Sequence, residues 1–554
     1  MRTMDHEEQV ETTSVPPVHG RPSRRGHRIG ADGKAALAIG LVLLGVYWIT
    51  MGGHTYSVDG ETYLAGTRAL FHHTTVLTPG TDLDAVVIAV ENKNGQLTTA
   101  APIGTLLLFS PGFAAGKIVA APFAVEHQEE IIRLVYLSAN SAMTAITAMV
   151  LFFLCRRLGA SRSSAVLLAI AYGLGTWAWA HAQTDFSEPG TALLLTSSLL
   201  ASVHWWERRT TRAAALVGFL AGCTVLTRSS TMLFIPVLLM AGLVGHSVRV
   251  ERQRVRQLAA FCCGGALPAV AFALNSWVRF GSPFDSGYPM MRFSTPIYEG
   301  VYGLFLSPGK GLLLYAPICI VVVFAVRTSA LTHPRYAATV GGILVTHLLV
   351  YARFDIWSGE NAYGPRYLVP VLPAIVALLA PVIDTGRQWV RGARVAAIAG
   401  FLIPGLLGSL MYFNAVYFAQ QQQVAADFEV SSITTKQLHL VWNYYPRTSP
   451  LMLHIRSLPD LVRNTADRMS GEPGGITPFP AAYEERIHWH ARAIELDTWW
   501  AWWPAKGGPG AVYILLLLPV SLLAAGVQLA RRNWANEASP CPGSSAPSPD
   551  TQPA

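Results

Sequence analysis

Charged residues are scarce in this sequence. Only 13% of its 554 residues are Asp, Glu, Lys or Arg, whereas 51% are hydrophobic, and a soluble globular protein carries about 25% charged residues. The apolar residues come in runs of about 20, the length that crosses the hydrocarbon core of a bilayer. The composition therefore excludes an ordinary soluble domain and predicts a polytopic membrane protein.

Cysteine is also rare, and its spacing excludes two classes of small domain. The six cysteines lie in or beside apolar runs or in the C-terminal tail: Cys155, Cys223, Cys262, Cys263, Cys319 and Cys541. A disulfide framework or a zinc site needs paired or regularly spaced cysteines, which are lacking here. The formal net charge of +8 does not indicate nucleic acid as a partner, because the basic residues form short clusters between apolar runs.

The apolar runs predict an all-α fold with about 12 transmembrane helices. We place the spans near residues 34–51, 132–154, 163–181, 189–206, 213–227, 230–246, 258–275, 311–326, 336–352, 367–383, 395–418 and 511–530. Residues 100–125 are apolar but are interrupted by Pro102, Pro111, Gly112, Gly116 and Pro122, so we interpret them as a re-entrant or surface-lying pair of helices.

Clusters of arginine predict the orientation of these spans. Residues 156–162, 208–212 and 249–256 are rich in arginine and fall on one side, which the positive-inside rule identifies as the cytoplasm. Both termini are then cytoplasmic, and most polar loops face the outside of the plasma (inner) membrane.

The predicted organisation has five parts. These are a disordered cytoplasmic tail over 1–33, a transmembrane core over 34–418 with its first outside loop at 52–131, an extracytoplasmic segment over 419–510, a last transmembrane helix over 511–530 and a disordered cytoplasmic tail over 531–554. Trp499, Trp500, Trp502 and Trp503 in the third part are interpreted as an aromatic belt at the membrane interface.

The stretch YSVDGETYLAGTRALF, residues 56–71, directly follows the first span. Its apolar spacing predicts a short amphipathic helix along the membrane surface, with Tyr63 and Leu64 on the buried face. Asp59 and Glu61 stand at its start. Two interpretations of Asp59 are open: it is a general base, or it caps the helix that begins at Gly60.

Seven segments together resemble a known superfamily. They are SVDGETYL, NGQLTTAAPIGTLLLFSPGF, WAWAHAQTDFSEPGTALLL, LTRSSTMLFIPVLL, FGSPFDSGY, GLFLSPGKGLLLYAPI and WSGENAYGPRYLVPVLP. In this order, over roughly two thirds of the chain, they resemble bacterial GT-C membrane glycosyltransferases. The similarity is to phospholipid-carrier-dependent enzymes related to protein O-mannosyltransferases and the aminoarabinose transferase.

The resemblance implies a GT-C fold and a sugar donor linked to polyprenyl phosphate. In that superfamily an aspartate of the first outside loop is the catalytic base, and the matching residue here is Asp59. The sequence departs from the commoner Asp-Glu pair, because Gly60 separates Asp59 from Glu61. The catalytic role of Glu61 is therefore less well supported than that of Asp59.

Three basic residues are candidates for binding the donor phosphate. Arg366 in GPRYL, Lys310 in SPGKG and Arg228 in LTRSS each lie at the outside end of a span. Arginine offers a two-pronged contact to phosphate and lysine a point charge. The alternative is that these side chains reach to ordinary lipid headgroups.

Five further residues are candidates for binding the substrate or acceptor: Asp185, Glu188, Asp355, Trp357 and Tyr367. Asp185 and Glu188 either cap the following helix or provide a second carboxylate. The second carboxylate would orient the acceptor or, as in some GT-C enzymes, hold a divalent cation together with Asp59. Turn formation is the competing explanation for Asp355 and Trp357.

We therefore expect an integral-membrane inverting glycosyltransferase that moves a hexosyl or pentosyl group from a polyprenyl-phosphate donor to a glycan, protein or lipid hydroxyl outside the cell. Membrane lipids surround it, and no nucleic acid is involved. One alternative is a transporter or flippase of a lipid-linked saccharide, which predicts charges near span centres. A second is a scaffold without catalytic activity, which leaves the acid pair and GPRYL unexplained.

Overall fold

The structure, a computed structural model, describes residues 25–78, 81, 89–244, 251–288, 292–360, 362–417, 435–469, 494–503 and 510–538. The described residues are mostly helical, as predicted, with one two-stranded sheet added. Most of the two predicted disordered tails lies outside the described residues. Helix α1 begins at Arg25 and α24 ends at Ala538.

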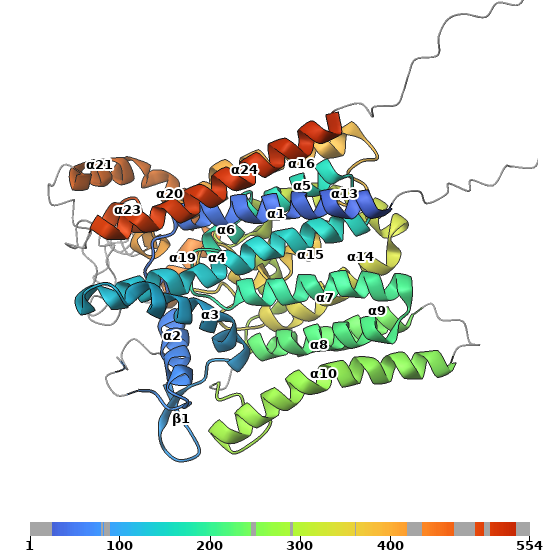
Figure 1. Ribbon diagram of the computed structural model, residues 1–554, viewed down its shortest axis with the longest axis horizontal. Helices are drawn as coiled ribbons and strands as arrows, with labels where there is room; N and C mark the ends of the chain where they lie inside the picture. Colours follow the sequence, from blue (N-terminus) through green and yellow to red (C-terminus); the bar gives the residue numbers. More distant parts are fainter. Residues whose placement is uncertain are drawn as a thin grey trace, which may run out of the picture.

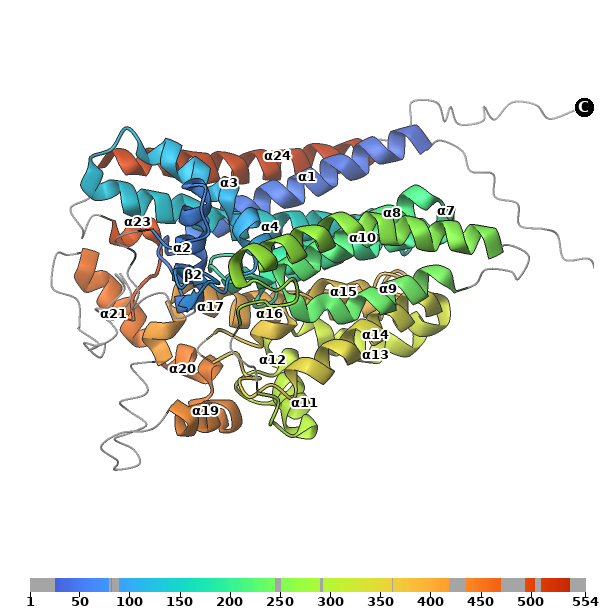
Figure 2. The ribbon, with the colours of Figure 1, turned by 90° about the horizontal axis from the view of Figure 1, so that it is seen from below.

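Long helices run side by side along the longest axis of the molecule (Figures 1 and 2). They are α1 (Arg25–Thr50), α4 (Val125–Arg157), α5 (Arg162–Leu174), α7 (Glu188–Arg208), α8 (Thr211–Thr227), α9 (Phe234–Leu243), α10 (Glu251–Phe280), α13 (Ile318–Thr332), α14 (Pro334–Tyr351), α16 (Arg387–Gly400) and α24 (Leu517–Ala538). Short helices connect or extend them: α6 (Ala178–His181), η1 (Ser229–Leu233), α11 (Ile297–Leu306), α12 (Leu312–Tyr315), η3 (Arg366–Leu368), α15 (Leu372–Ala377), η4 (Phe401–Gly405), α17 (Leu406–Leu410) and η7 (Gly510–Leu516).

The described helices are consistent with a multi-pass membrane protein. Six helical segments are long and apolar enough to cross a bilayer: 30–50, 103–120, 125–157, 251–280, 387–410 and 510–533. Each predicted span overlaps at least one described helix. The number of crossings, about 12 by the hydrophobic runs, stays a prediction.

Small residues set the spacing between neighbouring helices. A β carbon on Gly218 of α8 would lie 2.0 Å from the carbonyl oxygen of Phe261, and one on Gly264 of α10 would lie 1.9 Å from that of Ala215. Helices in membranes associate through such close backbone approach, because lipid tails remove the hydrophobic driving force. Glycine at these two positions therefore lets α8 and α10 lie together.

Residues 100–125 form one helix, α3 (Ile103–Ala120), and the expected pair of helices is wrong. Pro111 lies inside it. A β carbon on Gly112 or Gly116 would lie 2.9 Å from the carbonyl oxygens of Tyr136 and Ile132 on α4. The two glycines are thus spaced for close packing on a neighbouring helix, not for breaking their own helix, which is what the sequence pattern suggested.

The first outside loop contains helix α2 (Val58–Phe71) and a hairpin of strands β1 (Ala89–Glu91) and β2 (Leu97–Thr99). The strands pair antiparallel, with Val90 opposite Thr98. Helix α2 runs across the bundle axis in Figure 1 and is seen nearly end-on in Figure 2. Tyr63 and Leu64 are buried against protein. That α2 lies along a membrane surface stays a prediction.

The described parts of the last outside segment lie at the same end of the bundle as α2 (Figures 1 and 2). They are α19 (Thr435–Tyr444), η5 (Pro446–Thr448), α20 (Pro450–Arg456), α21 (Leu458–Met469) and α23 (Trp499–Trp502). The interfacial-belt interpretation is wrong for Trp499 and Trp503, which are only 2% and 1% exposed. Trp499 Nε1 donates to the Trp48 carbonyl at 3.0 Å, so this cluster fastens the last segment to the end of α1.

Candidate active site

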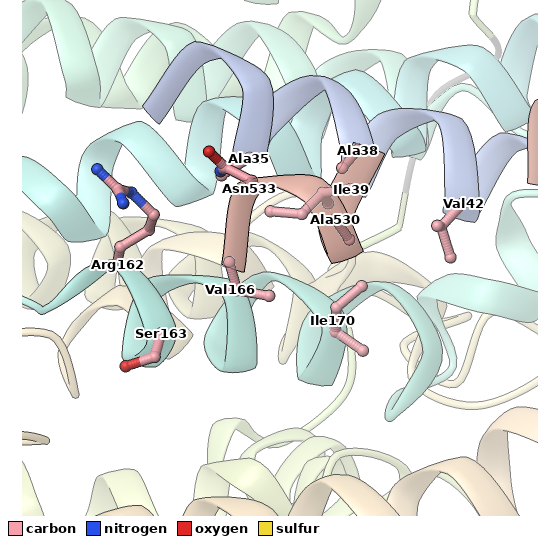
Figure 3. A pocket seen from close by; sticks show the side chains of 10 residues that line it. All are labelled: Ala35, Ala38, Ile39, Val42, Arg162, Ser163, Val166, Ile170, Ala530 and Asn533. Atoms are coloured by element: carbon pink, nitrogen blue, oxygen red, sulfur yellow. The ribbon is translucent and has the colours of Figure 1, made fainter. Parts of the chain in front are cut away.

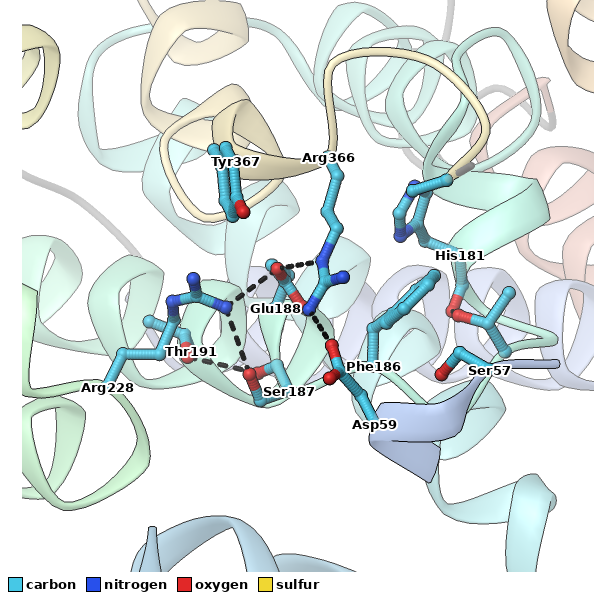
Figure 4. A network of polar contacts seen from close by, with 12 residues as sticks. Ser57, Asp59, His181, Phe186, Ser187, Glu188, Thr191, Arg228, Arg366 and Tyr367 are labelled. Atoms are coloured by element: carbon cyan, nitrogen blue, oxygen red, sulfur yellow. Dashed lines mark hydrogen bonds and ion pairs between the residues drawn. The ribbon is translucent and has the colours of Figure 1, made fainter. Parts of the chain in front are cut away.

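One arginine joins the first outside loop to the bundle. Arg366 opens η3, and its Nη2 donates to Asp59 Oδ2 while its Nε donates to Glu188 Oε1 at 2.6 Å (Figure 4). Asp59 comes from α2 and Glu188 is the first residue of α7. The guanidinium therefore bridges two carboxylates from distant parts of the chain, with one charge-assisted hydrogen bond to each.

A second arginine shares the same carboxylate. Arg228 follows the last turn of α8, and its Nη1 donates to Glu188 Oε1 at 2.7 Å and to Ser187 Oγ at 3.1 Å (Figure 4). Glu188 is fully buried, and its other oxygen, Oε2, has no hydrogen-bond partner among the described residues. A buried carboxylate needs paired charges to be tolerated, and two guanidiniums supply them.

Aromatic rings cover both guanidiniums. Arg366 Cζ lies 4.0 Å from the centre of the Phe186 ring. Arg228 Cζ lies 5.5 Å from the ring centres of both Tyr351 and Tyr367, and these two rings stack at 4.4 Å. Cation–π contact of this kind holds a guanidinium in place and excludes water from one of its faces. Tyr367 therefore has two contacts: its ring packs against the Arg228 guanidinium, and it borders the cavity.

Three of these charged groups, Asp59, Arg228 and Arg366, border a cavity of about 760 Å³. Ligand sites commonly measure about 300–1,000 Å³. Asp59, whose side chain is 21% exposed, faces this space. The lining combines polar and apolar side chains: Asp59, Tyr63, Ser187, Thr227, Arg228, Ser229, Ser230, Met232, Leu233, Tyr288, Arg292, Phe293, Val350, Tyr351, Phe354, Asp355, Ile356, Glu360, Arg366 and Tyr367, with Pro102 and Gly359. Such a lining suits a ligand that has both a charged and a hydrocarbon part.

Asp59 does not cap its helix, which removes one of the two interpretations left open by the sequence. The N-cap is Ser57, whose Oγ accepts a hydrogen bond from the Gly60 backbone N–H at 3.0 Å. Ser57 Oγ in turn donates to Asp185 Oδ1 at 2.8 Å. The Asp59 carboxylate is thus left for Arg366 and the cavity.

Asp185 holds the backbone that leads to Asp59. Its Oδ2 accepts from the Tyr56 N–H at 2.8 Å, and the side chain is fully buried. Burial raises the pKa of Asp185 to about 7, although hydrogen bonds from Ser57 and Tyr56 oppose this shift. A β carbon on Gly60 would lie 1.8 Å from Asp185 Oδ2. The glycine that interrupts the acid pair therefore makes room for Asp185.

Glu61 does not line the cavity. It is buried and accepts hydrogen bonds from Thr55 Oγ1 and Arg133 Nη1. Arg133, on α4, also contacts Glu129 at 3.0 Å. The structure thus separates the two acids of the predicted catalytic pair: Asp59 faces the cavity, and Glu61 fastens α2 to α4.

The last outside segment contacts the residues just before Asp59. Asp497 accepts from His54 Nε2 at 2.8 Å and from Tyr56 Oη at 3.1 Å. The Asn414 side-chain amide donates to the Tyr56 carbonyl at 2.8 Å. Tyr56 is therefore held from three directions, by Asp185, Asn414 and Asp497.

Lys310 lies outside the cavity lining. Its Nζ donates to the backbone carbonyls of Glu360, at 2.9 Å, and Ala362, and it is buried. Burial, and then the charge of Arg366, lower the pKa of Lys310 to about 7. Lys310 thus shapes the loop that carries Arg366, and the structure does not bring it to a phosphate position.

Of the other two predicted binding residues, one lines the cavity and one does not. Asp355 borders the cavity, and its Oδ1 accepts from the Ser294 N–H at 2.9 Å. Trp357 is buried beside Gly303 and Tyr444 and does not line the cavity. Asp355 can therefore contact a ligand directly, whereas Trp357 packs behind the residues that line the cavity.

The arrangement does not fit a divalent cation between Asp59 and Glu188. The Arg366 guanidinium occupies the position between the two carboxylates, and Arg228 adds a second positive charge beside Glu188. Divalent cations need several oxygen ligands with a net negative charge. Within the described ranges, no three His, Cys, Asp or Glu side chains gather as a metal site.

Several residues of the site were not among the sequence candidates. Tyr63, Tyr288 and Tyr351 line the cavity, and Arg133 and Asp497 support the loop that carries Asp59. Arg133 is an arginine within an apolar helix, which marks a buried partner and was a usable signal. Nothing in the sequence around Asp497 distinguishes it.

Comparison with known proteins gives matches among solved structures alone. No family model matches the sequence, and no curated protein matches it. The Archaeoglobus fulgidus oligosaccharyltransferase tethered with an acceptor peptide is 13% identical, with a TM-score of 0.47 over 75% of this chain and 60% of that one. AglB from the same organism, in complex with an inhibitory peptide and a dolichol-phosphate, is 12% identical, with a TM-score of 0.46 over 77% and 64%.

ArnT from Cupriavidus metallidurans, bound to undecaprenyl phosphate, is 14% identical, with a TM-score of 0.46 over 90% of this chain and 77% of that one. The chain spans about three fifths of the length of the archaeal enzymes.

Proposed function

We propose that the chain is an integral-membrane inverting glycosyltransferase that moves a sugar from a polyprenyl-phosphate donor to an acceptor hydroxyl on the extracytoplasmic side. The observation that carries this proposal is a single cavity bordered by a part-exposed carboxylate, Asp59, and two guanidiniums, Arg366 and Arg228. The acceptor belongs to one of three classes: glycan, protein or lipid.

Each group has a defined part in the transfer. Asp59 takes the proton of the acceptor hydroxyl as its oxygen attacks the anomeric carbon. The bond between that carbon and the phosphate oxygen breaks, and the oxygen keeps the electron pair. Arg366 and Arg228 stabilise the negative charge that develops on the departing lipid phosphate. A single displacement of this kind inverts the configuration at the anomeric carbon.

The apolar part of the cavity suits the lipid portion of such a donor. Met232 and Leu233 on η1 are 59% and 40% exposed and border the cavity together with Val350 at the end of α14. Hydrocarbon-facing side chains beside a charged pocket allow a lipid to keep its chain in the membrane while its phosphate reaches the arginines.

The test is reconstitution with a panel of polyprenyl-phosphate sugars, comparing the wild type with Asp59→Asn. Transfer should fall by about 10²- to 10⁴-fold, the usual contribution of a positioned general base. Asp460→Asn is the control, because Asp460 is an exposed acid of α21 that does not line the cavity. Equal transfer by the wild type and Asp59→Asn would remove the proposed base.

Reconstitution of the protein into lipid vesicles also tests the flippase alternative. A translocating protein would move the labelled lipid-linked sugar between leaflets without an acceptor, and adding an acceptor would not change that rate. We expect sugar transfer that requires an acceptor.

A further inference from the structure

A second cavity lies at the opposite end of the bundle from α2. It measures about 180 Å³ and is enclosed by α1, α5 and α24 (Figure 3). Ala35 and Ala38 on α1 and Ala530 on α24 form one side, and Val166 and Ile170 on α5 form the other. Arg162 lies at one end of the hollow, and Val42 at the other (Figure 3).

The three helices are in close contact at the Val42 end of the hollow. A β carbon on Gly526 of α24 would lie 2.9 Å from the backbone nitrogen of Val42, and one on Gly173 of α5 would lie 2.8 Å from Leu43 Cδ1. Beyond these contacts, toward Arg162, α1 and α24 present alanine instead of a large side chain. The space that larger residues would fill is left open.

The surroundings of this cavity indicate what fills it. Helix α24 exposes Leu517 and Val520, at 63% and 53%, so its outer face contacts hydrocarbon in a membrane. The cavity wall is apolar apart from Arg162, Ser163 and Asn533. Water needs several polar partners to occupy a cavity, and most of this wall offers none. A hydrocarbon chain from the bilayer fits the lining.

The rim of the cavity carries excess positive charge. Asp32 accepts from both Arg162, at 2.8 Å, and Arg156, at 3.1 Å, so one carboxylate serves two guanidiniums. Lys34 and Arg532 are exposed, next in sequence to the lining residues Ala35 and Asn533. Asp384, a second acid among the side chains that the structure describes at this end, accepts hydrogen bonds from Ser161 and Ser164. Among these described side chains, four are cationic (Lys34, Arg156, Arg162 and Arg532) and two are acidic (Asp32 and Asp384).

We propose that this cavity binds an anionic phospholipid, with the first part of one acyl chain between α1, α5 and α24 and the phosphate at Arg162. This end is the one that the arginine clusters predict to be cytoplasmic, and anionic lipids collect in that leaflet. The site does not depend on the glycosyltransferase proposal, because it shares no residue with the cavity at Asp59.

The experiment adds phosphatidylglycerol or phosphatidylcholine to the full chain in detergent and measures the melting temperature and, by native mass spectrometry, the bound lipid. Phosphatidylglycerol should raise the melting temperature more than phosphatidylcholine does. Ala530→Leu and Ala38→Leu, which fill the cavity, should abolish that difference. The control is Ala525→Leu, on the exposed face of α24, which should retain it.

A second pair of variants tests the headgroup contact. Arg162→Gln should weaken phosphatidylglycerol binding about fivefold, as expected for one basic residue near an anionic lipid, whereas the exposed Arg327→Gln should leave it unchanged. Equal effects of the two lipids on the wild type would overturn the proposal. So would a preference for phosphatidylglycerol that persists in both cavity-filling variants, or one that is lost equally in Ala525→Leu.

Discussion

Gly60 lies against the Asp185 carboxylate, where a β carbon would be 1.8 Å from Oδ2. Gly60→Ala therefore forces either Asp185 or the start of α2 to move, and Asp59 moves with it. We expect at least a tenfold loss of sugar transfer, because a displacement of about 1 Å at a catalytic group can cost 100-fold.

Gly66→Ala is the control for this change, because Gly66 lies on the same helix and its nearest neighbours are side-chain atoms at 3.0–3.1 Å. Transfer assays and thermal unfolding of both variants provide the measurement. Equal activity of Gly60→Ala and Gly66→Ala would show that the contact with Asp185 does not position Asp59.

Asp185 predicts a pH dependence of stability. Its pKa is raised to about 7 in the folded protein by burial, whereas the unfolded chain has an ordinary value of about 3.9. The folded state therefore holds a proton that the unfolded state has lost, so this stabilisation is complete below about pH 4 and declines as the pH rises toward 7.

Asp185→Asn is neutral at every pH and can still accept from the Tyr56 N–H. The wild type should match it near pH 4 and become less stable than it at pH 7, as measured by denaturant unfolding. Asp460→Asn, at an exposed acid of α21, should follow the wild type. Parallel curves for the wild type and Asp185→Asn would contradict the prediction.

Arg366 contacts two carboxylates at once, and lysine cannot reproduce that geometry. Arg366→Lys keeps the charge but loses one of the two contacts, so we expect KM for the lipid-linked donor to rise about tenfold or more. Arg366→Ala leaves Asp59 without this partner and Glu188 with Arg228 alone, which should lower the free energy of unfolding by about 3–5 kcal/mol.

Arg353→Lys is a suitable control, because Arg353 is exposed and its Nη2 contacts the Phe293 carbonyl at 3.4 Å. Donor titrations and denaturant unfolding check both expectations. An unchanged KM in Arg366→Lys would mean that this arginine does not meet the donor.

Asp497 fastens the last outside segment to His54 and Tyr56. In Asp497→Ala this attachment is lost, and His54 keeps its contact to the Thr55 carbonyl. We expect slower transfer and faster proteolysis of the last outside segment, measured on the same preparation. Asp460→Ala should change neither. Transfer at the wild-type rate by Asp497→Ala would show that this segment does not hold the loop of Asp59.

Local pattern was enough to find the four charged residues of the ion-pair network beside the cavity. Each of the four lies at the outside end of an apolar run: Asp59, Glu188, Arg228 and Arg366. The predicted topology therefore places all of them on the same side of the bundle. The partner that each one takes was not predictable, because Asp59 and Arg366 are 307 residues apart and no local rule pairs them. For the same reason, Lys310 was grouped with the arginines.

Features that depend on neighbouring helices were misread. Gly112 and Gly116 looked like helix breakers because glycine has that effect in isolation, whereas here they lie against the α4 backbone. Trp499 and Trp503 looked like interface residues because aromatic density is the same in a belt and in a buried cluster. Gly60 looked like a defect in the acid motif, although it is required by a carboxylate on a different loop.

The sharing of one guanidinium by Asp59 and Glu188 has a kinetic consequence. An arriving phosphate competes for the N–H groups that Asp59 occupies, and Glu188, fully buried and also held by Arg228, is the harder of the two carboxylates to displace. In the proposed transfer, donor arrival would then free the base, so the two substrates would bind in a fixed order, donor before acceptor. Without a bound donor the protein would be inactive, because Asp59 would stay paired with Arg366.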